Sequence, residues 1–190
     1  MPHAPLINKL RRIGLHVGLL EWLTDYLTLR KQQVVVNGAK SCLASVTSGV
    51  PQGSVLGPLL FSIYINDITE VPLSPTSSLV MYADDILYHR LIRDTCELEE
   101  VQSDVTKLEE WSDNHLLELN PQKCKSMILS KKRCPTTRSV SLYLCGSELE
   151  EVEIFKYLGV LLSRNLSWSD HISELCTKAR RILGLLYRQF

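Results

Sequence analysis

Hydrophobic and polar positions alternate along the chain with two different periods. Apolar residues recur three or four positions apart, as on one face of a helix, in residues 19–27, 59–68, 98–111 and 172–186. Short apolar runs typical of strands occupy residues 33–36, 42–47, 79–82, 86–88, 126–129, 140–144 and 155–161. Because helices and strands are mixed and short turns join neighbouring strands, the pattern predicts the α+β class. We expect an antiparallel sheet with helices packed on one face.

Turn residues and prolines separate these elements. Asn37-Gly38 is typical of a two-residue turn, so residues 33–36 and 42–47 are predicted to form a hairpin. Pro58 can begin a helix, since its missing N–H is not needed in the first turn. Residues 94–97 read Asp-x-x-Glu and resemble a capping box. Residues 133–138 are predicted to be a loop. A short strand is predicted before it, at residues 126–129, and another after it, at residues 140–144.

Two acidic residues, Asp84 and Asp85, interrupt the apolar runs 79–82 and 86–88. The pattern predicts a hairpin with both carboxylates at its tip. Neighbouring carboxylates repel each other, and burying them costs several kcal/mol without a compensating positive charge. Magnesium binds carboxylate oxygens and keeps coordination positions open for phosphate. Taken alone, the pair is more simply interpreted as a polar hairpin turn.

Composition limits where the protein works. Its 190 residues, 45% of them apolar, suffice for one domain with a sizeable core. No apolar run reaches the roughly 18 residues of a membrane-spanning helix, and residues 1–5 lack the layout of a signal peptide. The scattered cysteines show no zinc-ligand spacing and indicate reduced thiols: Cys42, Cys96, Cys124, Cys134, Cys145 and Cys176. We expect an intracellular protein, in the cytoplasm or the nucleus.

The formal net charge is zero, but the charges are not evenly distributed. No carboxylate lies between Asp25 and Asp67 or between Glu118 and Glu148, and residues 178–188 are also free of acids. Nucleic acid responds to local basic surface rather than to the total charge. On charge alone, ordinary solvated faces are the favoured explanation of these segments.

Four motifs follow one another along the chain. Residues 49–61 read GVPQGSVLGPLLF and are followed by YINDI at 64–68; YADD stands at 82–85, LNPQKCK at 119–125 and YLGV at 157–160. In content and order they resemble the reverse transcriptases of non-LTR retrotransposons, over nearly the whole chain. The alanine of YADD and the Asn-Asp pair after the helix favour non-LTR or group II intron relatives over retroviruses. The same strings argue against an RNA-templated RNA polymerase.

The resemblance implies a partial polymerase palm over residues 1–165 and the start of a thumb helix over residues 166–190. It also implies a third metal-binding aspartate, within a phrase like F-D-x-V-x-H. The first residues, MPHAPL, are similar to the end of that phrase, after its aspartate. On this interpretation the first catalytic strand is missing. We expect the polypeptide alone not to polymerise DNA.

The resemblance assigns catalytic roles to three residues. Asp84 and Asp85 would bind the Mg²⁺ or Mn²⁺ ions that bridge the primer 3′-hydroxyl and the incoming triphosphate. Asp84 is the direct ligand, and Asp85 would lie partly beside the ions or at the primer end. Lys123 matches a lysine thought to protonate the leaving pyrophosphate. An ordinary surface lysine is an equal alternative, and Lys125 competes for the role.

Nucleic-acid contacts are implied at two further places. Glycines in the loop would allow close approach of template and nucleotide, and its glutamine offers both donor and acceptor; a tight loop before a helix would also need glycine and proline. The implied contacts with template, nucleotide or phosphate are Gly49, Pro51, Gln52, Gly53 and Arg30. The YLGV motif resembles the family's primer-contacting hairpin, so Tyr157, Leu158 and Gly159 would position the primer end. A strand with a glycine bulge is the alternative.

The implied function is that of an RNA-directed DNA polymerase with an RNA template, a DNA primer and deoxynucleoside triphosphates. The alternative is a non-catalytic nucleic-acid-binding remnant of a mobile element. Its binding surface would be the basic segments 123–138 and 178–188. A gene fragment unable to fold is a further alternative.

Overall fold

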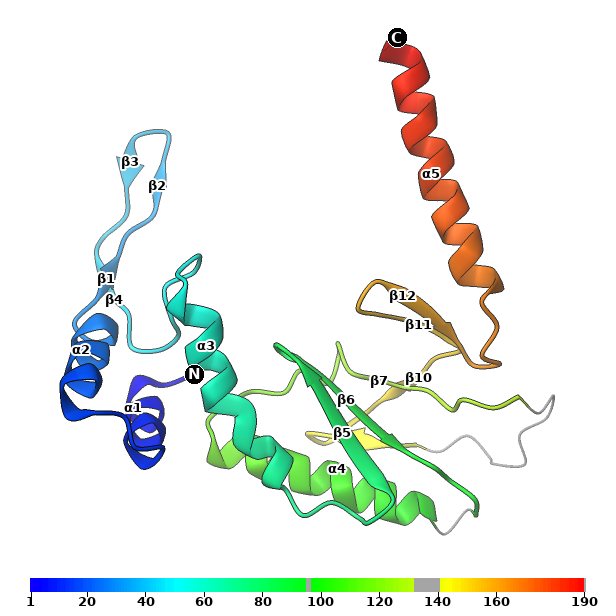
Figure 1. Cartoon of the computed structure of the whole chain (residues 1–190), viewed down its shortest axis with the longest axis horizontal. Helices are drawn as coiled ribbons and strands as arrows, with labels where there is room; N and C mark the ends of the chain where they lie inside the picture. The colour runs from blue at the N-terminus through cyan, green and yellow to red at the C-terminus, as the bar shows by residue number, and fades with distance from the viewer. Residues whose placement is uncertain (95–96, 132–140, 190) are drawn as a thin grey trace. The chain divides into compact units, whose positions relative to one another are not determined.

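The computed structural model describes residues 1–94, 97–131 and 141–189 (Figure 1). The chain divides into two compact units. Unit 1 comprises Met1–Ile92 and Ser103–Leu119, and unit 2 comprises Arg93–Gln102 and Asn120–Phe190. The predicted boundary near residue 165 is a different division and stays a prediction. The predicted loop 133–138 lies outside the described residues.

The core of unit 1 is helical. It is built by α1 (His3–Arg12), α2 (Val17–Leu27), α3 (Leu56–Ile65), the 3-10 helix η1 (Asn66–Glu70) and the second half of α4 (Glu97–Asn114). Leucines one turn apart on α1 and α2 pack against aromatic and aliphatic residues of the other helices. The buried cluster is Leu6, Leu10, Leu20, Leu23, Leu27, Leu60, Tyr64, Ile65, Ile68 and Trp111. The predicted helices at 19–27, 59–68 and 98–111 are confirmed.

Helix α1 was not predicted from the sequence. Leu6, Ile7 and Leu10 form a short apolar face, and Pro5 lowers the helical propensity of the segment. Pro5 is tolerated because it lies in the first turn, where its missing N–H breaks no intrahelical bond. Leu6 and Leu10 are both fully buried, so packing stabilises a helix that the local pattern signals weakly.

Unit 1 also contains three antiparallel strand pairs. β1 (Lys31–Gln32) pairs with β4 (Ala44–Ser45), and β2 (Val35–Val36) pairs with β3 (Ala39–Lys40) across the predicted Asn37-Gly38 turn. Both turn residues have positive φ, 49° and 83°, as a two-residue hairpin loop requires. β5 (Ser77–Tyr82) and β6 (Asp85–Arg90) form the longest ladder. Both predicted hairpins are therefore confirmed.

Unit 2 combines short strands with one long helix. β7 (Lys125–Ser126) pairs with β10 (Glu150–Glu151) in parallel, and β8 (Tyr143–Leu144) pairs with β9 (Ser147–Glu148). β11 (Ile154–Tyr157) and β12 (Val160–Ser163) form a hairpin that precedes α5 (Ser169–Gln189). The helix predicted at 172–186 is confirmed. The single strand predicted over 155–161 is wrong, because Leu158 and Gly159 form a two-residue turn with φ of 46° and 85°. The hairpin that the resemblance implies at YLGV is confirmed.

The mixed helix-and-strand class is confirmed, but the strands do not build one sheet. Among the described residues they form two-stranded pairs, five antiparallel and one parallel. Four of these ladders have only two residue pairs each, too short a backbone edge for a further strand to join easily. In the same described part of the chain, none of the helices combines the length and the apolar character needed to cross a membrane.

Candidate functional site

Asp84 and Asp85 lie at the tip of the β5–β6 hairpin, as predicted. Tyr82 pairs with Asp85 in the last rung of the ladder, so Ala83 and Asp84 form a two-residue turn. Ala83 has φ of 53°, in the left-handed region that non-glycine residues enter at a cost of roughly 1–2 kcal/mol. The tight turn releases Asp84 from the alternation of strand side chains. Both aspartates are exposed.

The base of the same hairpin is fixed by a buried carboxylate, Asp104 of α4, which has no exposed surface. The hydroxyl groups of Ser77 on β5 and Tyr88 on β6 donate to Asp104 Oδ2 at 2.6 and 3.1 Å. Ser74 donates to Oδ1 through its backbone N–H at 3.0 Å and its hydroxyl at 3.1 Å. Lys107 Nζ adds an ion pair at 3.1 Å. Both strands are thereby tied to one helix.

These donors keep Asp104 ionised. Burial by itself raises the pKa of its carboxyl, but the hydrogen bonds from Ser77, Lys107, Ser74 and Tyr88 outweigh burial and lower the pKa to about 2. Burial, together with the adjacent Asp104, also raises the pKa of the Tyr88 phenol. The sequence interpretation missed this residue. The signal was an aspartate between Val101, Val105 and Leu108, on the predicted apolar face.

The loop of residues 49–53 is anchored to the start of the chain. Gly49 N–H donates to Met1 O at 2.7 Å, and His3 Nε2 donates to Gly49 O at 2.8 Å. Gly49 and Gly53 have positive φ, 84° and 79°, and no atom lies within 4 Å of the position a Cβ would take. Glycine is therefore required by the backbone, and the open space also permits close approach of a ligand. Pro51 is half-buried and Gln52 is exposed.

A third glycine, Gly57, controls how this loop joins α3. Its N–H donates to Ser54 Oγ at 3.1 Å, and Ser54 N–H donates to Pro51 O at 3.2 Å. A Cβ on Gly57 would lie 3.0 Å from Ser54 Oγ and 3.3 Å from a methyl carbon of Val50. Sequence reasoning assigned Gly57 no role of its own, although it stands inside the most specific motif.

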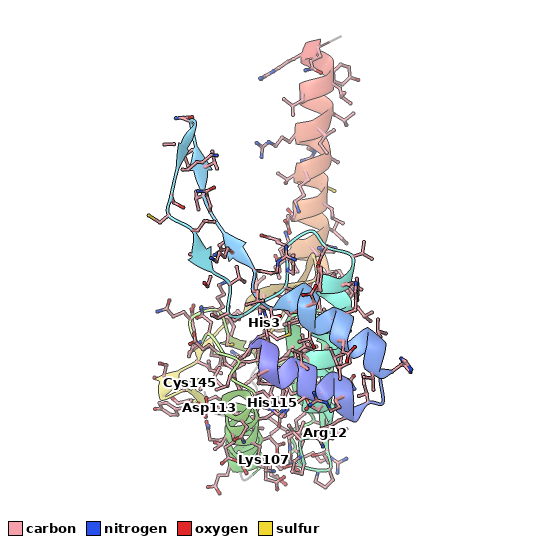
Figure 2. The ribbon with its side chains drawn as sticks, turned by 90° about the vertical axis from the view of Figure 1, so that its left-hand side faces the viewer. His3, Arg12, Lys107, Asp113, His115 and Cys145 are labelled. Atoms are coloured by element: carbon pink, nitrogen blue, oxygen red, sulfur yellow. The ribbon has the colours of Figure 1, made fainter. Side chains whose placement is uncertain are left out.

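Tyr64 and Asp67 of the YINDI motif hold elements of unit 1 together. Asp67 bonds Lys9 Nζ at 2.7 Å and His115 Nε2 at 3.0 Å, so it joins η1 to α1 and to the residue after α4. Tyr64, fully buried, donates to His115 O at 2.5 Å. Figure 2 labels His115 and, on α4, Lys107 and Asp113. Asp67 therefore has partners within the fold.

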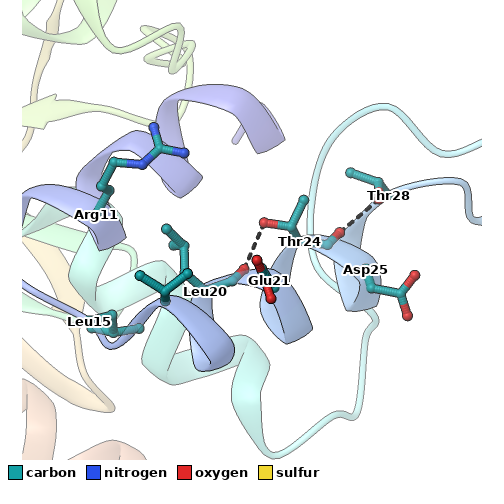
Figure 3. A pocket seen from close by; sticks show the side chains of 8 residues that line it. Arg11, Leu15, Leu20, Glu21, Thr24, Asp25 and Thr28 are labelled. Carbon is teal, nitrogen blue, oxygen red and sulfur yellow. Dashed lines mark hydrogen bonds between the residues drawn. The ribbon is translucent and has the colours of Figure 1, made fainter.

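A hollow of unit 1, about 510 Å³ in volume, is lined by none of the predicted site residues (Figure 3). Residues of α1 and α2 line it, among them Arg11, Glu21 and Asp25. Thr24 and Thr28 donate to carbonyl groups of their own helix, Leu20 O at 2.7 Å and Thr24 O at 2.8 Å. This hollow gives no support to a catalytic role.

In unit 2, the two candidate lysines have different surroundings. Asn120 closes a turn, accepting from Gln122 N–H at its side chain and from Lys123 N–H at its carbonyl, both at 3.1 Å. Lys125 Nζ lies 2.5 Å from the Glu150 carboxylate, whereas Lys123 is exposed. An ammonium group held by a carboxylate is less available to a phosphate. This difference makes the ammonium group of Lys123 the more available of the two to a phosphate.

Residues 157–159 form the turn of the β11–β12 hairpin in unit 2. Leu158 and Gly159 are exposed at the turn, while the Tyr157 hydroxyl is buried without a hydrogen-bond partner among the described residues. The hairpin is joined to α5, since Ser163 Oγ donates to Asp170 Oδ2 at 2.7 Å. His171 Nδ1 accepts from Leu161 N–H at 3.4 Å.

The predicted site residues are thus distributed over both units. Unit 1 carries Asp84, Asp85, the loop 49–53 and Arg30, an exposed residue whose guanidinium lies 5.4 Å from the Tyr26 ring centroid. Unit 2 carries Lys123 and residues 157–159. Within the described ranges, no group of three or more His, Cys, Asp or Glu side chains could hold a metal ion. Asp84 and Asp85 supply two carboxylates, which suit a hard divalent cation as part of a larger ligand set.

The family of the chain follows from comparison with known proteins. Residues 1–162 match the family described as reverse transcriptase (RNA-dependent DNA polymerase). The match covers most of the chain and includes all four motifs. The chain therefore belongs to the reverse transcriptase family.

Individual relatives specify the kind of element. The RNA-directed DNA polymerase from the mobile element jockey of Drosophila melanogaster is 29% identical over 184 residues, 91% of this chain and 19% of that protein. The probable RNA-directed DNA polymerase from transposon X-element of the same species is 33% identical over 171 residues, 87% of this chain and 18% of that protein. A third, from transposon BS, is 32% identical over 181 residues. The resemblance to non-LTR retrotransposon enzymes is confirmed, and the chain spans about a fifth of these relatives.

Proposed function

We propose that this chain forms part of the catalytic region of an RNA-directed DNA polymerase, which extends a DNA primer on an RNA template with deoxynucleoside triphosphates. The observation that carries the proposal is the pair Asp84 and Asp85. They are exposed at a two-residue turn whose strands are fixed at the other end by the buried Asp104. A rigid hairpin that presents adjacent carboxylates is suited to holding metal ions in one place.

Asp84 and Asp85 are the metal-binding residues of the proposal, with magnesium as the metal and manganese as a substitute. When bound, such ions polarise phosphoryl oxygens and lower the pKa of an attacking hydroxyl group. Asp84 lies in the turn itself and Asp85 is the first residue of β6, so we assign the direct contact to Asp84. Two carboxylates are only part of the ligand set that a divalent ion needs, so Asp84 and Asp85 by themselves are proposed not to support polymerisation.

The remaining residues would position substrates. Gly49 and Gly53 leave open space beside their backbone, and the exposed Gln52 can both donate and accept hydrogen bonds, which suits contact with template and nucleotide. Lys123, exposed after the Asn120 turn, would stabilise or protonate the leaving pyrophosphate. Leu158 and Gly159 would contact the primer end. The hydroxyl of Tyr157 is buried, so this side chain would support the turn of the hairpin rather than stack on a base.

On this proposal residues 1–165 are a partial palm and residues 166–190 begin a thumb helix. The polymerase would act inside the cell, in the cytoplasm or the nucleus. The alternative, a non-catalytic binder of nucleic acid, would use the basic segments 123–138 and 178–188. Lys178, in one of them, is already ion-paired to Glu174 at 2.7 Å.

A chimera tests the proposal. Residues 1–190 would replace the matching segment of the jockey polymerase, which supplies the regions before and after it. We expect template-dependent primer extension that depends on magnesium and is lost in the Asp84→Ala chimera. Extension that persists in both Asp84→Ala and Asp85→Ala would refute the assignment of the metal site. The jockey polymerase itself serves as the positive control.

A further inference from the structure

Helix α2 carries a ladder of stacked side chains on its outer face. The rings of Trp22 and Tyr26 are nearly parallel, with centroids 5.8 Å apart and an interplanar angle of 15°. The Arg30 guanidinium lies 5.4 Å from the Tyr26 centroid, and its Nη1 donates to Tyr26 O at 3.3 Å. Trp22 and Tyr26 lie four positions apart on α2, so the helix aligns them on one face, whereas Arg30 lies beyond the helix end at Leu27 and reaches back to Tyr26.

The outermost ring of this ladder is open to solvent. Trp22 is 53% exposed, although indole is among the side chains that gain most from burial. Tyr26 is half-buried and packs against the core, which fixes the inner end of the stack. A rigid, exposed aromatic face backed by a cation is what a nucleic acid base stacks on, because every base has a π-face.

The chain that follows the ladder is basic and projects from α2. Figure 1 shows the β1–β4 and β2–β3 pairs as one long arm that leads away from the helix. Arg30, Lys31 and Lys40 lie in this arm and are exposed, and no carboxylate occurs between Asp25 and Asp67. The arm is therefore complementary in charge to a phosphate backbone.

Two acids of α2, Glu21 and Asp25, are close to the stacked rings in sequence. Glu21 precedes Trp22 by one position, about 100° around the helix, whereas Asp25 follows Trp22 by three positions and is its neighbour on the helix surface. Both carboxylates line the hollow shared with α1, where Arg11 also lies (Figure 3). Asp25 therefore places one negative charge beside the ladder, against the three cations Arg30, Lys31 and Lys40.

We propose that the ladder Trp22–Tyr26–Arg30 and the arm from Lys31 to Lys40 bind single-stranded nucleic acid, with a base stacked on Trp22 and phosphates held by the cations. The proposal rests on the proposed polymerase function only for the choice of nucleic acid as partner. The surface is separate from the loop 49–53 and from Asp84 and Asp85 in sequence and in the residues that form it. It would bind the single-stranded nucleic acid at a place apart from the proposed catalytic residues.

Intrinsic tryptophan fluorescence tests this surface in the 190-residue chain. Trp111 is buried, so a Trp168→Phe background leaves Trp22 as the exposed fluorophore. Titration with a single-stranded oligothymidylate at low salt should quench Trp22. Trp22→Ala should weaken binding about tenfold, measured by anisotropy of a labelled oligonucleotide. Arg30→Gln should reduce the slope of log K against log salt by about 0.7.

Matched variants separate stacking from other effects. Arg12→Gln removes an exposed arginine of α1 in the same unit and should leave affinity and salt slope unchanged (Figure 2). Trp22→Phe keeps a ring and should restore most of the affinity lost in Trp22→Ala. Circular dichroism should show the same helix content in all variants.

Several results would overturn the proposal. These are no binding at low salt, binding without quenching of Trp22, or equal losses in Trp22→Phe and Trp22→Ala. Equally tight binding of duplex, unaffected by Trp22→Ala, would also overturn it. Asp84→Ala should leave oligonucleotide binding intact while it abolishes extension by the chimera. Failure of this surface and failure of the proposed polymerase function are therefore distinguishable.

Discussion

The Ser77 hydroxyl donates a 2.6 Å hydrogen bond to the buried Asp104 carboxylate, which links the first residue of β5 to helix α4. Tyr88 makes the corresponding bond from β6 at 3.1 Å. A single side chain thus fixes both strands of the hairpin that carries Asp84 and Asp85. The hairpin's orientation depends on a residue that itself has no contact with solvent.

Asp104→Ala should destabilise the chain by about 3 kcal/mol, since it leaves buried donors, including the Lys107 ammonium, without their acceptor. Urea unfolding followed by circular dichroism measures the loss. Asp113→Ala is the matched control, because Asp113 is an exposed aspartate on the same helix (Figure 2). Its effect should stay within about 0.5 kcal/mol. Similar losses in the two variants would contradict a specific role for Asp104.

The pKa of Asp104 gives a prediction for acid. Its carboxyl has a pKa of about 2 in the folded chain, against its usual 3.8. Because the folded value is the lower one, ionised Asp104 stabilises the fold fully above about pH 4, by about 2 kcal/mol. This contribution is lost as the pH falls toward 2.

The free energy of unfolding at pH 6 and at pH 2.5 tests this linkage, by comparison of the parent chain with Asp104→Asn. We expect the stability difference between parent and variant to shrink markedly at the lower pH. A difference that is the same at both pH values would show that the charge of Asp104 is not the cause.

Ala83 makes the β5–β6 turn sensitive to side-chain shape. Its φ of 53° is strained for any residue with a Cβ and most strained for a β-branched one. Ala83→Val should therefore cost about 1–2 kcal/mol in urea unfolding, and Ala83→Gly should be neutral or stabilising. Ala44→Val on the exposed strand β4 is the control and should cost nothing. If Ala83→Val is as harmless as Ala44→Val, the turn does not require the left-handed conformation.

Gly57 and Gly184 should respond to alanine with opposite signs. Both are helical, so alanine raises helix propensity by roughly 1 kcal/mol at either position. At Gly57 the new Cβ would lie 3.0 Å from Ser54 Oγ and break the cap of α3, whereas nothing lies within 4 Å at Gly184. Gly57→Ala should lower stability by about 1 kcal/mol and Gly184→Ala should raise it. Stabilisation by both would show that the loop can shift without cost.

Local patterns predicted the parts of this protein that local forces determine. The Asn37-Gly38 turn and the hairpin around Asp84 were predictable because turn residues stand between apolar runs. Helix α1 was not, since its apolar face is short, Pro5 lies in its first turn, and the burial of that face depends on partners distant in sequence. The apolar pattern predicted one strand across Leu158-Gly159, and the hairpin there was indicated only by the resemblance of YLGV. Its leucine adopts a conformation that residue type alone does not indicate.

The site was predictable only in part, for a related reason. Motif residues can be recognised one by one, but what supports them comes from other elements. Asp104 lies nineteen positions beyond Asp85 and contacts the far end of its hairpin. The ion pair of Lys125 with Glu150 bridges twenty-five positions. Neither relationship has a spacing that a sequence pattern could reveal.

The ion pair between Lys125 and Glu150 allows the two candidate lysines to be distinguished by experiment. Lys123 is exposed, whereas the Lys125 ammonium lies 2.5 Å from a carboxylate. In the active chimera, Lys123→Ala should slow single-nucleotide addition roughly 100-fold or more, as loss of a general acid does. Lys125→Ala should change it only a few-fold, and Lys123→Arg, which keeps the charge but is a poor acid, should stay slow. Full activity in Lys123→Arg would indicate an electrostatic clamp, and a larger loss in Lys125→Ala would transfer the role to that residue.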